Sequence, residues 1–257
     1  MLGEMLAQVL EARVRMPVER RFYLAGTYIC QQAILAGRID VYVEYTGTAL
    51  AAILKEPIKT DSKAVFETVR SEYQRRFNLA VLPSLGFNNT FALAMRGEDA
   101  RANRIATLSD LAAYAPKMRI GVGYEFLERE DGFPGLAKTY GLHFAAAPSV
   151  MDLGLLYRAL EAKQVDIVAG SNTDGVIAAL GLVVLDDDKH YFPPYDAVPI
   201  VRPEALQRFS GMQSALEGLS GRITTEDMRR LNYAVDGEKR DAADVVRAFL
   251  TTLSTPR

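Results

Sequence analysis

The sequence has little of the chemistry on which many enzymes and disulfide-linked domains depend. It contains 257 residues but one cysteine, Cys30, and two histidines, His143 and His190. One cysteine cannot form an intramolecular disulfide, so the redox compartment stays open. Neither histidine has an acid and a nucleophile at a recognisable spacing, and no Gly-x-Ser-x-Gly elbow, P-loop or HExxH motif is present. We therefore expect a protein that is not an enzyme and that requires no cofactor.

Charge and hydropathy argue against two further classes of protein. The formal net charge is −2, which gives no support for a nucleic-acid partner, because such a partner requires a basic face. No apolar run is long enough to cross a bilayer, and no signal-peptide pattern precedes the first expected helix. We expect a soluble chain; a signal peptide or membrane anchor that was removed, or that lies outside these residues, stays open.

A metal site is also not expected. The acidic run 186–188 consists of three aspartates in a row, without the spaced ligands of a calcium-binding loop. A solvated turn is the simpler interpretation of such a run.

Strands alternate with helices along the chain, which is long enough for one large domain or two small ones. The expected strands cover residues 18–24, 39–43, 80–82, 90–95, 119–122, 165–169, 182–185 and 197–201. The expected helices cover residues 2–13, 27–36, 46–54, 62–77, 108–114, 133–140, 152–162, 173–179, 203–217, 224–235 and 242–253. This alternation predicts α/β layers with mainly parallel sheets.

One pattern occurs twice. Residues 33–47 and 159–175 each read as a helix, a short turn, an (Ile/Val)-Asp-(Val/Ile) strand and a helix start that contains Thr and Gly. The repetition indicates two lobes of similar construction, although α/β units also share such patterns by chance.

Polar residues follow both repeated strands. In open α/β sheets, ligands bind beyond the carboxyl ends of strands, where helix N-termini also point. Thr46, Thr48, Ser171 and Thr173 can donate or accept hydrogen bonds there. Helix capping explains Thr173 and Asp174 equally well. The placement of all these residues at strand ends favours a binding site.

Three other stretches have both a structural and a functional interpretation. The run 88–91, Asn-Asn-Thr-Phe, reads as a turn or as polar ligands before a strand. Arg129 lies in an acidic loop, either in a solvated ion-pair cluster or as a guanidinium fork for a carboxylate. The run 191–195, Tyr-Phe-Pro-Pro-Tyr, places aromatic rings on a rigid connector, which can also be a hinge packed on the edge of a core.

Five motifs in order resemble one protein family: GRIDVYVEYTGTAL, LGFNNTFALAMR, EFLEREDGFPGL, VDIVAGSNTDG and LDDDKHYFPPYDAVPIVR. They are similar to the substrate-binding proteins of osmoprotectant ABC transporters, of the type that binds glycine betaine, carnitine and choline. The resemblance covers nearly the whole chain. It implies a two-lobed type II periplasmic-binding-protein fold that closes over its ligand by hinge motion. The implied lobes are 1–95 with 196–257, and 96–195, with hinges near 92–98 and 190–197.

The resemblance also implies a ligand site in the cleft between the lobes. A trimethylammonium group would lie in an aromatic cage through cation–π attraction, and arginine with polar groups would hold a carboxylate. On this basis Tyr45 lies in the cage and Thr48 near the carboxylate end, and Asn89 and Phe91 lie at the pocket. Many relatives have tyrosine at the position of Phe91. Arg129 matches the arginine of an Arg-x-Asp-Gly motif, and Tyr195 matches the tyrosine of a Pro-Pro-Tyr connector. The full predicted site is Tyr45, Thr48, Asn89, Thr90, Phe91, Arg129, Ser171, Asn172, Thr173, Asp174 and Tyr195.

Two departures from the family pattern stand out. Relatives often have tyrosine where this chain has Ser171, and the loss of that ring would cost roughly 0.5–2 kcal/mol of cation attraction and enlarge the pocket. Relatives also begin with a β-strand and a Ser-Lys-x-Phe-Thr-Glu-like loop that have no counterpart here. Whether another segment, a second chain or a longer polypeptide supplies that strand stays open.

The implied ligand and partners follow. With Arg129 present we expect a zwitterion rather than choline: glycine betaine, carnitine, or a bulkier betaine such as ergothioneine. The implied partner is an ABC permease, as a separate subunit or a fused domain, in a periplasmic or extracytoplasmic location and associated with the membrane through the transporter. Two alternatives are a ligand-sensing domain that regulates a partner and an enzyme on this scaffold. The small number of candidate acid–base residues argues against the enzyme.

Overall fold

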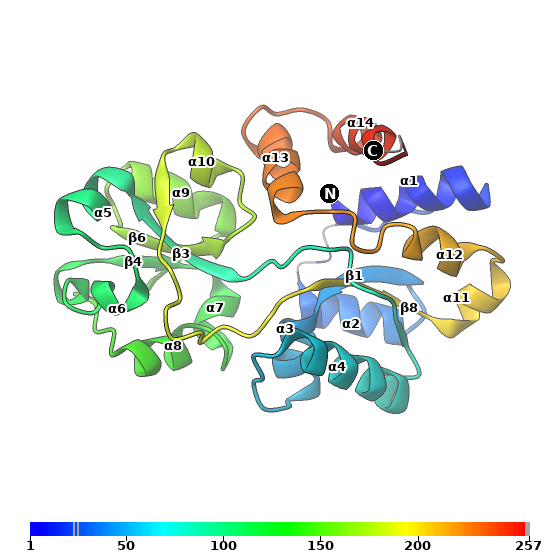
Figure 1. The fold of residues 1–257 in the computed structure, drawn as a ribbon, viewed down its shortest axis with the longest axis horizontal. Coiled ribbons are helices and arrows are strands. Elements are labelled where there is room, and N and C mark those ends of the chain that lie inside the picture. The colour runs from blue at the N-terminus through cyan, green and yellow to red at the C-terminus, as the bar shows by residue number, and fades with distance from the viewer. Residues whose placement is uncertain (23, 25, 255–257) are drawn as a thin grey trace. The chain divides into compact units, whose positions relative to one another are not determined.

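The computed structural model describes residues 1–22, 24 and 26–254, which form two compact units (Figure 1). Unit 1 comprises Met1–Asn89 and Pro194–Arg257, and unit 2 comprises Thr90–Pro193. Both units combine a β-sheet with helices, so the expected α/β class is confirmed.

Unit 1 has a three-stranded sheet in the order β1-β8-β2. The strands are β1 (Val41–Tyr45), β2 (Ala80–Val81) and β8 (Ala197–Val201), and both pairings are antiparallel. The helices are α1 (Leu2–Val14), α2 (Thr27–Leu35), α3 (Thr46–Thr48), the π-helix η1 (Ala49–Leu54), α4 (Ser62–Phe77), α11 (Pro203–Arg208), α12 (Met212–Glu217), α13 (Thr225–Asp236) and α14 (Ala242–Ser254). One sheet face packs with α1, α12, α13 and α14, and the other with α4 and η1.

Unit 2 has a five-stranded sheet in the order β5-β4-β6-β3-β7. The strands are β3 (Phe91–Arg96), β4 (Ile120–Val122), β5 (Ser149–Val150), β6 (Ile167–Ser171) and β7 (Leu182–Val184). The helices are α5 (Gly97–Asn103), α6 (Leu108–Leu111), the 3₁₀ helix η2 (Ala115–Lys117), α7 (Tyr124–Glu128), α8 (Phe133–Tyr140), α9 (Leu153–Glu161) and α10 (Val176–Ala179). Residues of α6, α7 and α8 cover one sheet face and those of α9 the other.

The strand pairing is mixed, which corrects the prediction of mainly parallel sheets. In unit 2, β4 is parallel to β5 and β6, but β3 is antiparallel to both of its neighbours. In unit 1, β8 is likewise antiparallel to both of its neighbours. β3 and β8 are the first strands after the chain enters units 2 and 1 at Thr90 and Pro194. The first strand after each passage of the chain from one unit to the other is therefore antiparallel to its neighbours.

The units divide at 89/90 and 193/194, a few residues before the expected limits at 95/96 and 195/196. The difference at the first limit arises because β3 is paired with β6 and β7 along its length and so belongs wholly to unit 2. The hinge itself stays a prediction.

The expected strand at 18–24 does not form over its described residues, 18–22 and 24; residue 23 lies outside them. Ion pairs direct this segment to α1 instead. Arg20 donates from Nε to Glu4 Oε2 at 2.7 Å and from Nη1 to Glu11 Oε1 at 2.7 Å. The ring of Phe22 lies over Gly3, where a Cβ would be 2.8 Å from its Cε1 atom. Among the described residues, no strand precedes β1.

The repeated pattern in the sequence corresponds to a repeated strand pair. β1 pairs with β8 in one unit, and β6 pairs antiparallel with β3 in the other. In both, the aspartate just before one strand forms an ion pair with an arginine at the end of the partner strand. Asp40, before β1, meets Arg202, just after β8, at 3.3 Å, and Asp166, before β6, meets Arg96, the last residue of β3, at 3.2 Å. The similarity of the two sequence segments therefore reflects similar construction.

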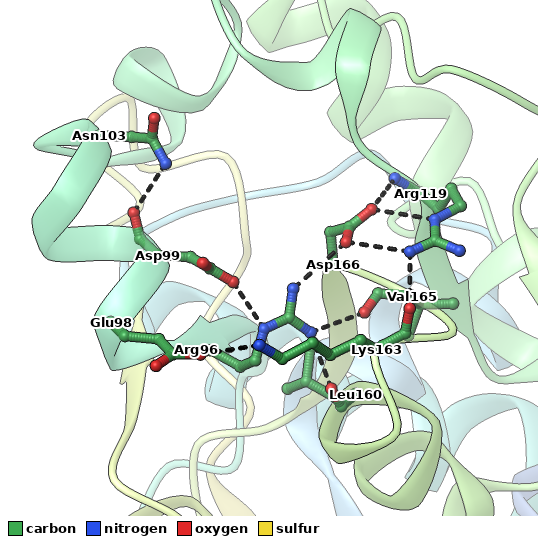
Figure 2. Close-up of polar contacts among 9 residues, drawn as sticks. All are labelled: Arg96, Glu98, Asp99, Asn103, Arg119, Leu160, Lys163, Val165 and Asp166. Atoms are coloured by element: carbon green, nitrogen blue, oxygen red, sulfur yellow. Dashed lines mark hydrogen bonds and ion pairs between the residues drawn. The ribbon is translucent and has the colours of Figure 1, made fainter.

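Figure 2 shows that the ion pair in unit 2 is part of a larger network. Arg96, whose side chain is 13% exposed, donates from Nη1 to the carbonyls of Leu160 at 2.7 Å and Val165 at 2.9 Å. The Asp166 carboxylate also accepts the backbone N–H and Nε–H of Arg119. Burial alone would raise the pKa of the Asp166 carboxyl, but the bonds from Arg119 and Arg96 outweigh it and hold the pKa below its ordinary value.

These contacts predict unequal effects of two matched substitutions. Asp166→Asn removes charge-assisted bonds from the partly buried Arg96 network and should lower the free energy of unfolding by about 1–3 kcal/mol. Asp40→Asn, whose aspartate is 54% exposed, should cost less than about 1 kcal/mol. Urea unfolding of both variants measures the difference, and equal losses would contradict the role assigned to the network.

The ion pair of Asp166 with Arg96 makes the stability of the protein depend on pH. The pKa of Asp166 is lower in the folded protein than in the unfolded chain. The contribution of Asp166 to the free energy of unfolding is therefore complete above the unfolded pKa of about 4, and it is lost as the pH falls through the folded pKa. The stability gap between the unaltered chain and Asp166→Asn should therefore shrink only below about pH 4.

Candidate ligand-binding site

Tyr45 ends β1 and is paired with Ala197 on β8. Its ring is half-buried and meets Phe87 edge to face, with centroids 6.4 Å apart. The neighbouring Glu44 is 2% exposed, and its Oε1 accepts the Tyr45 N–H at 2.8 Å and the Thr27 hydroxyl at 3.4 Å. The acid that ends this strand therefore fixes the backbone at Tyr45 and ties it to the start of α2.

Gly47 allows Tyr195 to pack against the first turn of α3. A Cβ at Gly47 would lie 2.8 Å from ring atoms Cδ1 and Cε1 of Tyr195 and 2.8 Å from the Pro194 carbonyl oxygen. The Tyr195 ring is accordingly 2% exposed. The glycine between the two threonines of the Thr-Gly-Thr motif is required by this contact.

Thr46 holds the backbone on both sides of Tyr195 in place. Its hydroxyl donates to the Pro194 carbonyl and accepts the Asp196 N–H, each at 3.0 Å. Because these bonds use the hydroxyl, and Thr46 is fully buried, its role is structural. Thr48, which is 4% exposed, lies in the same turn.

Asn89 completes the unit 1 group. Its N–H donates to the Tyr195 carbonyl at 2.9 Å, and Asn88 forms a bridge with Asp196. Unit 1 therefore brings together four of the predicted site residues: Tyr45, Thr48, Asn89 and Tyr195.

In unit 2, Phe91 and Ser171 are directly paired on β3 and β6. One residue further, the Asn172 N–H donates to the Thr90 carbonyl at 3.0 Å. The end of this strand pair therefore joins two pairs of predicted site residues that are far apart in the sequence, Thr90 with Phe91 and Ser171 with Asn172.

Asp174 braces the turn that follows β6. Its Oδ2 accepts the Ser171 N–H at 2.9 Å and the Tyr157 hydroxyl at 2.6 Å. Burial raises the pKa of the Tyr157 hydroxyl, and the Asp174 carboxylate raises it further. Gly175, rather than Asp174, is the N-cap of α10, so the capping interpretation of Asp174 is wrong. Thr173, in the same turn, is 4% exposed.

Tyr157 is a residue that sequence reasoning missed. It lies on α9, whose apolar positions gave a helix prediction but no sign of a partner 17 residues away. The only signal was a tyrosine next to the apolar face, where a buried hydroxyl requires a hydrogen-bond partner.

Arg129 is buried, which rules out the solvated surface cluster as its environment. Its side chain is 7% exposed and that of Asp131 is 1% exposed. Nε donates to Asp131 Oδ1 at 2.8 Å and Nη2 to Oδ2 at 2.5 Å, a two-point pairing. The guanidinium carbon lies 5.2 Å from the centre of the Phe91 ring. Arg129 is thus fixed on an aromatic surface beside the β3–β6 strand end.

Three phenylalanines form that surface. Phe91 lies 4.8 Å from Phe126 and 5.8 Å from Phe192, measured between ring centroids. Tyr191 donates its hydroxyl to the Glu130 carbonyl at 2.9 Å and so supports the Arg129 loop. Burial, with the nearby Asp131 and Asp187 carboxylates, raises the pKa of Tyr191 to about 12.

The acidic run 186–188 is used for hydrogen bonding within the chain. Asp187 accepts the Tyr191 N–H at 3.0 Å, the Phe192 N–H at 2.9 Å and the Tyr140 hydroxyl. Asp188 accepts the Ser109 N–H. In the part of the chain that the structure describes, no group of three or more His, Cys, Asp or Glu side chains could hold a metal ion.

The packing at Gly47 predicts that its replacement disturbs Tyr195. Gly47→Ala should lower the free energy of unfolding by about 1–3 kcal/mol, because the added methyl group meets a ring and a backbone oxygen. Gly154→Ala is the control, since there a Cβ meets only an exposed Asp152 oxygen at 3.1 Å. Thermal melts of both variants test this, and a Gly47→Ala protein as stable as its control would contradict the close approach.

Comparison with known proteins identifies the family of the chain. The family model described as the substrate-binding domain of ABC-type glycine betaine transport systems matches residues 1–252. The ergothioneine transport permease/ergothioneine binding protein EgtU of Helicobacter pylori is 39% identical over 98% of this chain, which spans 45% of that protein. The carnitine transport binding protein OpuCC of Listeria monocytogenes is 33% identical over 97% of this chain and 81% of its own length.

Solved structures show the same fold. The crystal structure of a glycine betaine/carnitine/choline ABC transporter protein matches with a TM-score of 0.80 at 32% identity, over 97% of this chain and 92% of that one. The type II periplasmic-binding-protein fold is thereby confirmed. The chain belongs to the family of substrate-binding domains of ABC-type glycine betaine transport systems.

Proposed function

We propose that this chain is the extracytoplasmic solute-binding part of an ABC importer and that it binds a zwitterionic quaternary-ammonium compound. The observation that carries the proposal is Arg129, a buried cation held by Asp131 against Phe91 at the end of the β3–β6 pair. A planar guanidinium fixed in this way favours a carboxylate ligand. The family membership gives the transport context.

The contacts of Phe91 favour one end of the ligand. The resemblance places this residue at the pocket, and the cation near its ring is the chain's own Arg129. We therefore assign Phe91 to supporting the arginine at the carboxylate end. Tyr45 remains the proposed cage residue, and we add Tyr195, which packs against Gly47 two residues later.

The polar residues have supporting parts in this proposal. Thr48 and Asn89 lie beside the cage residues, while Thr90, Asn172 and Thr173 lie beside the β3–β6 strand end. Asp174 acts through the turn that it braces rather than through the ligand.

The proposed partner is an ABC permease. The Helicobacter relative is named as both a permease and a binding protein, and this chain spans less than half of it. None of the described helices is long and apolar enough to cross a membrane. The permease would then be a fused domain or a separate subunit, and the binding part would lie in the periplasm or on the outer side of the membrane.

Calorimetric titration tests the ligand class. Glycine betaine, carnitine or ergothioneine should bind, and choline, which lacks the carboxylate, should bind more weakly. Tyr45→Ala should weaken binding of the preferred betaine ten-fold or more, about 1.4 kcal/mol. Tyr45→Phe retains the ring face and is the matched control.

Arg129 needs a milder substitution, because Arg129→Ala would leave the Asp131 carboxylate buried without its main cation. Arg129→Lys keeps the charge but loses the fork, and it should also weaken betaine binding ten-fold or more. Choline binding as tight as betaine binding would contradict the carboxylate assignment. Unchanged affinity in both the Tyr45 and Arg129 variants would show that the site lies elsewhere.

A further inference from the structure

One hydroxyl group holds the turn that carries Arg129. The Tyr191 hydroxyl donates to the Glu130 carbonyl at 2.9 Å, and the Gly132 carbonyl oxygen lies 3.3 Å away as a second acceptor. These two carbonyls flank Asp131, whose carboxylate pairs with Arg129. Within the turn, the Gly132 N–H donates to the Arg129 carbonyl at 3.0 Å. The hydroxyl therefore fixes the backbone on both sides of the carboxylate that binds the guanidinium.

A glycine in helix α8 makes room for this hydroxyl. A Cβ at Gly135 would lie 2.1 Å from the Tyr191 hydroxyl oxygen and 2.6 Å from the Glu130 carbonyl oxygen. Gly135 is the third residue of α8, and within a helix glycine is less favourable than alanine. A side chain at this position would displace the hydroxyl from the turn. The residue at 135 is therefore matched to the hydroxyl, which indicates that the contact is part of the packing of α8.

Asp187 fixes the backbone that carries Tyr191. Its carboxylate accepts the N–H groups of Tyr191 at 3.0 Å and of Phe192 at 2.9 Å. The ring of Phe192 in turn packs with that of Phe91, with centroids 5.8 Å apart. Asp187 therefore places two successive aromatic residues, one at the Arg129 turn and one at the aromatic surface on which Arg129 lies.

The two aromatic residues support Arg129 by different routes. Phe192 packs with Phe91, and the guanidinium carbon lies 5.2 Å from the centre of the Phe91 ring. Tyr191 holds the turn instead, and Asp131 within that turn binds Nε and Nη2 of the guanidinium. A planar guanidinium recognises a carboxylate by its direction as well as by its charge. A turn without the hydroxyl would keep the charge of Arg129 but not its direction.

We propose that Tyr191 is a positioning residue, whose hydroxyl holds the Arg129 turn so that the guanidinium is directed at the ligand carboxylate. This inference rests on the proposed function, which assigns Arg129 to that carboxylate. Tyr191 acts through Arg129 rather than on the ligand, since its hydroxyl proton is donated to backbone carbonyls. Its effect is therefore specific to ligands that carry a carboxylate. Recognition of the ammonium group, assigned to Tyr45, does not depend on it.

Calorimetric titration of Tyr191→Phe with two ligands tests this role. The variant keeps the ring and loses the hydroxyl, so binding of the preferred betaine should weaken by roughly 3- to 10-fold, the effect of one hydrogen bond. Choline should bind the variant and the unaltered chain equally, because it has no carboxylate. A merely structural role would instead weaken the binding of both ligands. Equal losses for the betaine and choline, or an unchanged betaine affinity, would overturn the inference while the proposed function stands.

Tyr114→Phe is the matched control. Tyr114 and Tyr191 both pack at the edge of the same core cluster in unit 2. The Tyr114 hydroxyl, however, forms no hydrogen bond within the part of the chain that the structure describes. The control variant should therefore bind both ligands like the unaltered chain.

The Nε–H resonance of Arg129 gives a second readout that requires no ligand. This group donates to Asp131 at 2.8 Å, and Arg129→Lys identifies its signal in proton–nitrogen correlation spectra by removing it. The resonance should shift in Tyr191→Phe and stay in place in Tyr114→Phe. An unmoved resonance in Tyr191→Phe would overturn the positioning role. No betaine binding by the unaltered chain would overturn the proposed function, and the resonance would still decide whether Tyr191 positions Arg129.

Discussion

The hydrogen bonds between β6 and β3 run from an ion pair at one end of the strands to candidate ligand residues at the other. Asp166 and Arg96 close the first end, and Ser171 and Phe91 stand at the second. β1 and β8 repeat this plan, from Asp40 and Arg202 to Tyr45 and Ala197. Because each register is continuous between its two ends, the strand pairing fixes where the candidate site residues stand, and in unit 2 the Arg96 network supports that pairing.

Several side chains that look reactive in the sequence serve to hold others in place. Asp131 fixes Arg129, Asp174 fixes the turn at Ser171, and Asp187 fixes the connector that carries Phe192. A site built in this way presents few mobile groups to a ligand, which lowers the entropy lost on binding. The chemistry left for recognition is mostly aromatic surface and one arginine.

The sequence was sufficient where local pattern decides the structure. Residues 62–77 and 133–140 form helices with the predicted bounds, because capping residues and apolar periodicity agree there. The strands at 41–45 and 167–171 begin two residues later than predicted, since apolar Ile39 and Val165 read as strand although the aspartates after them bind arginine. The family motifs indicated which residues belong to the site. They could not show that Arg129 is buried, because Phe91, on which it lies, meets Phe126 and Phe192 only in the fold.

Gly47 and Tyr195 illustrate how the fold joins positions that the sequence separates by almost 150 residues. Glycine is required at position 47 because the ring of Tyr195 packs against it, and Tyr195 follows the whole of unit 2 in the sequence. A side chain at 47 would meet the Pro194 carbonyl oxygen whatever residue stands at 195, whereas a smaller residue at 195 is compatible with Gly47. In a library designed to alter ligand preference, position 195 can therefore be varied while glycine is kept at 47.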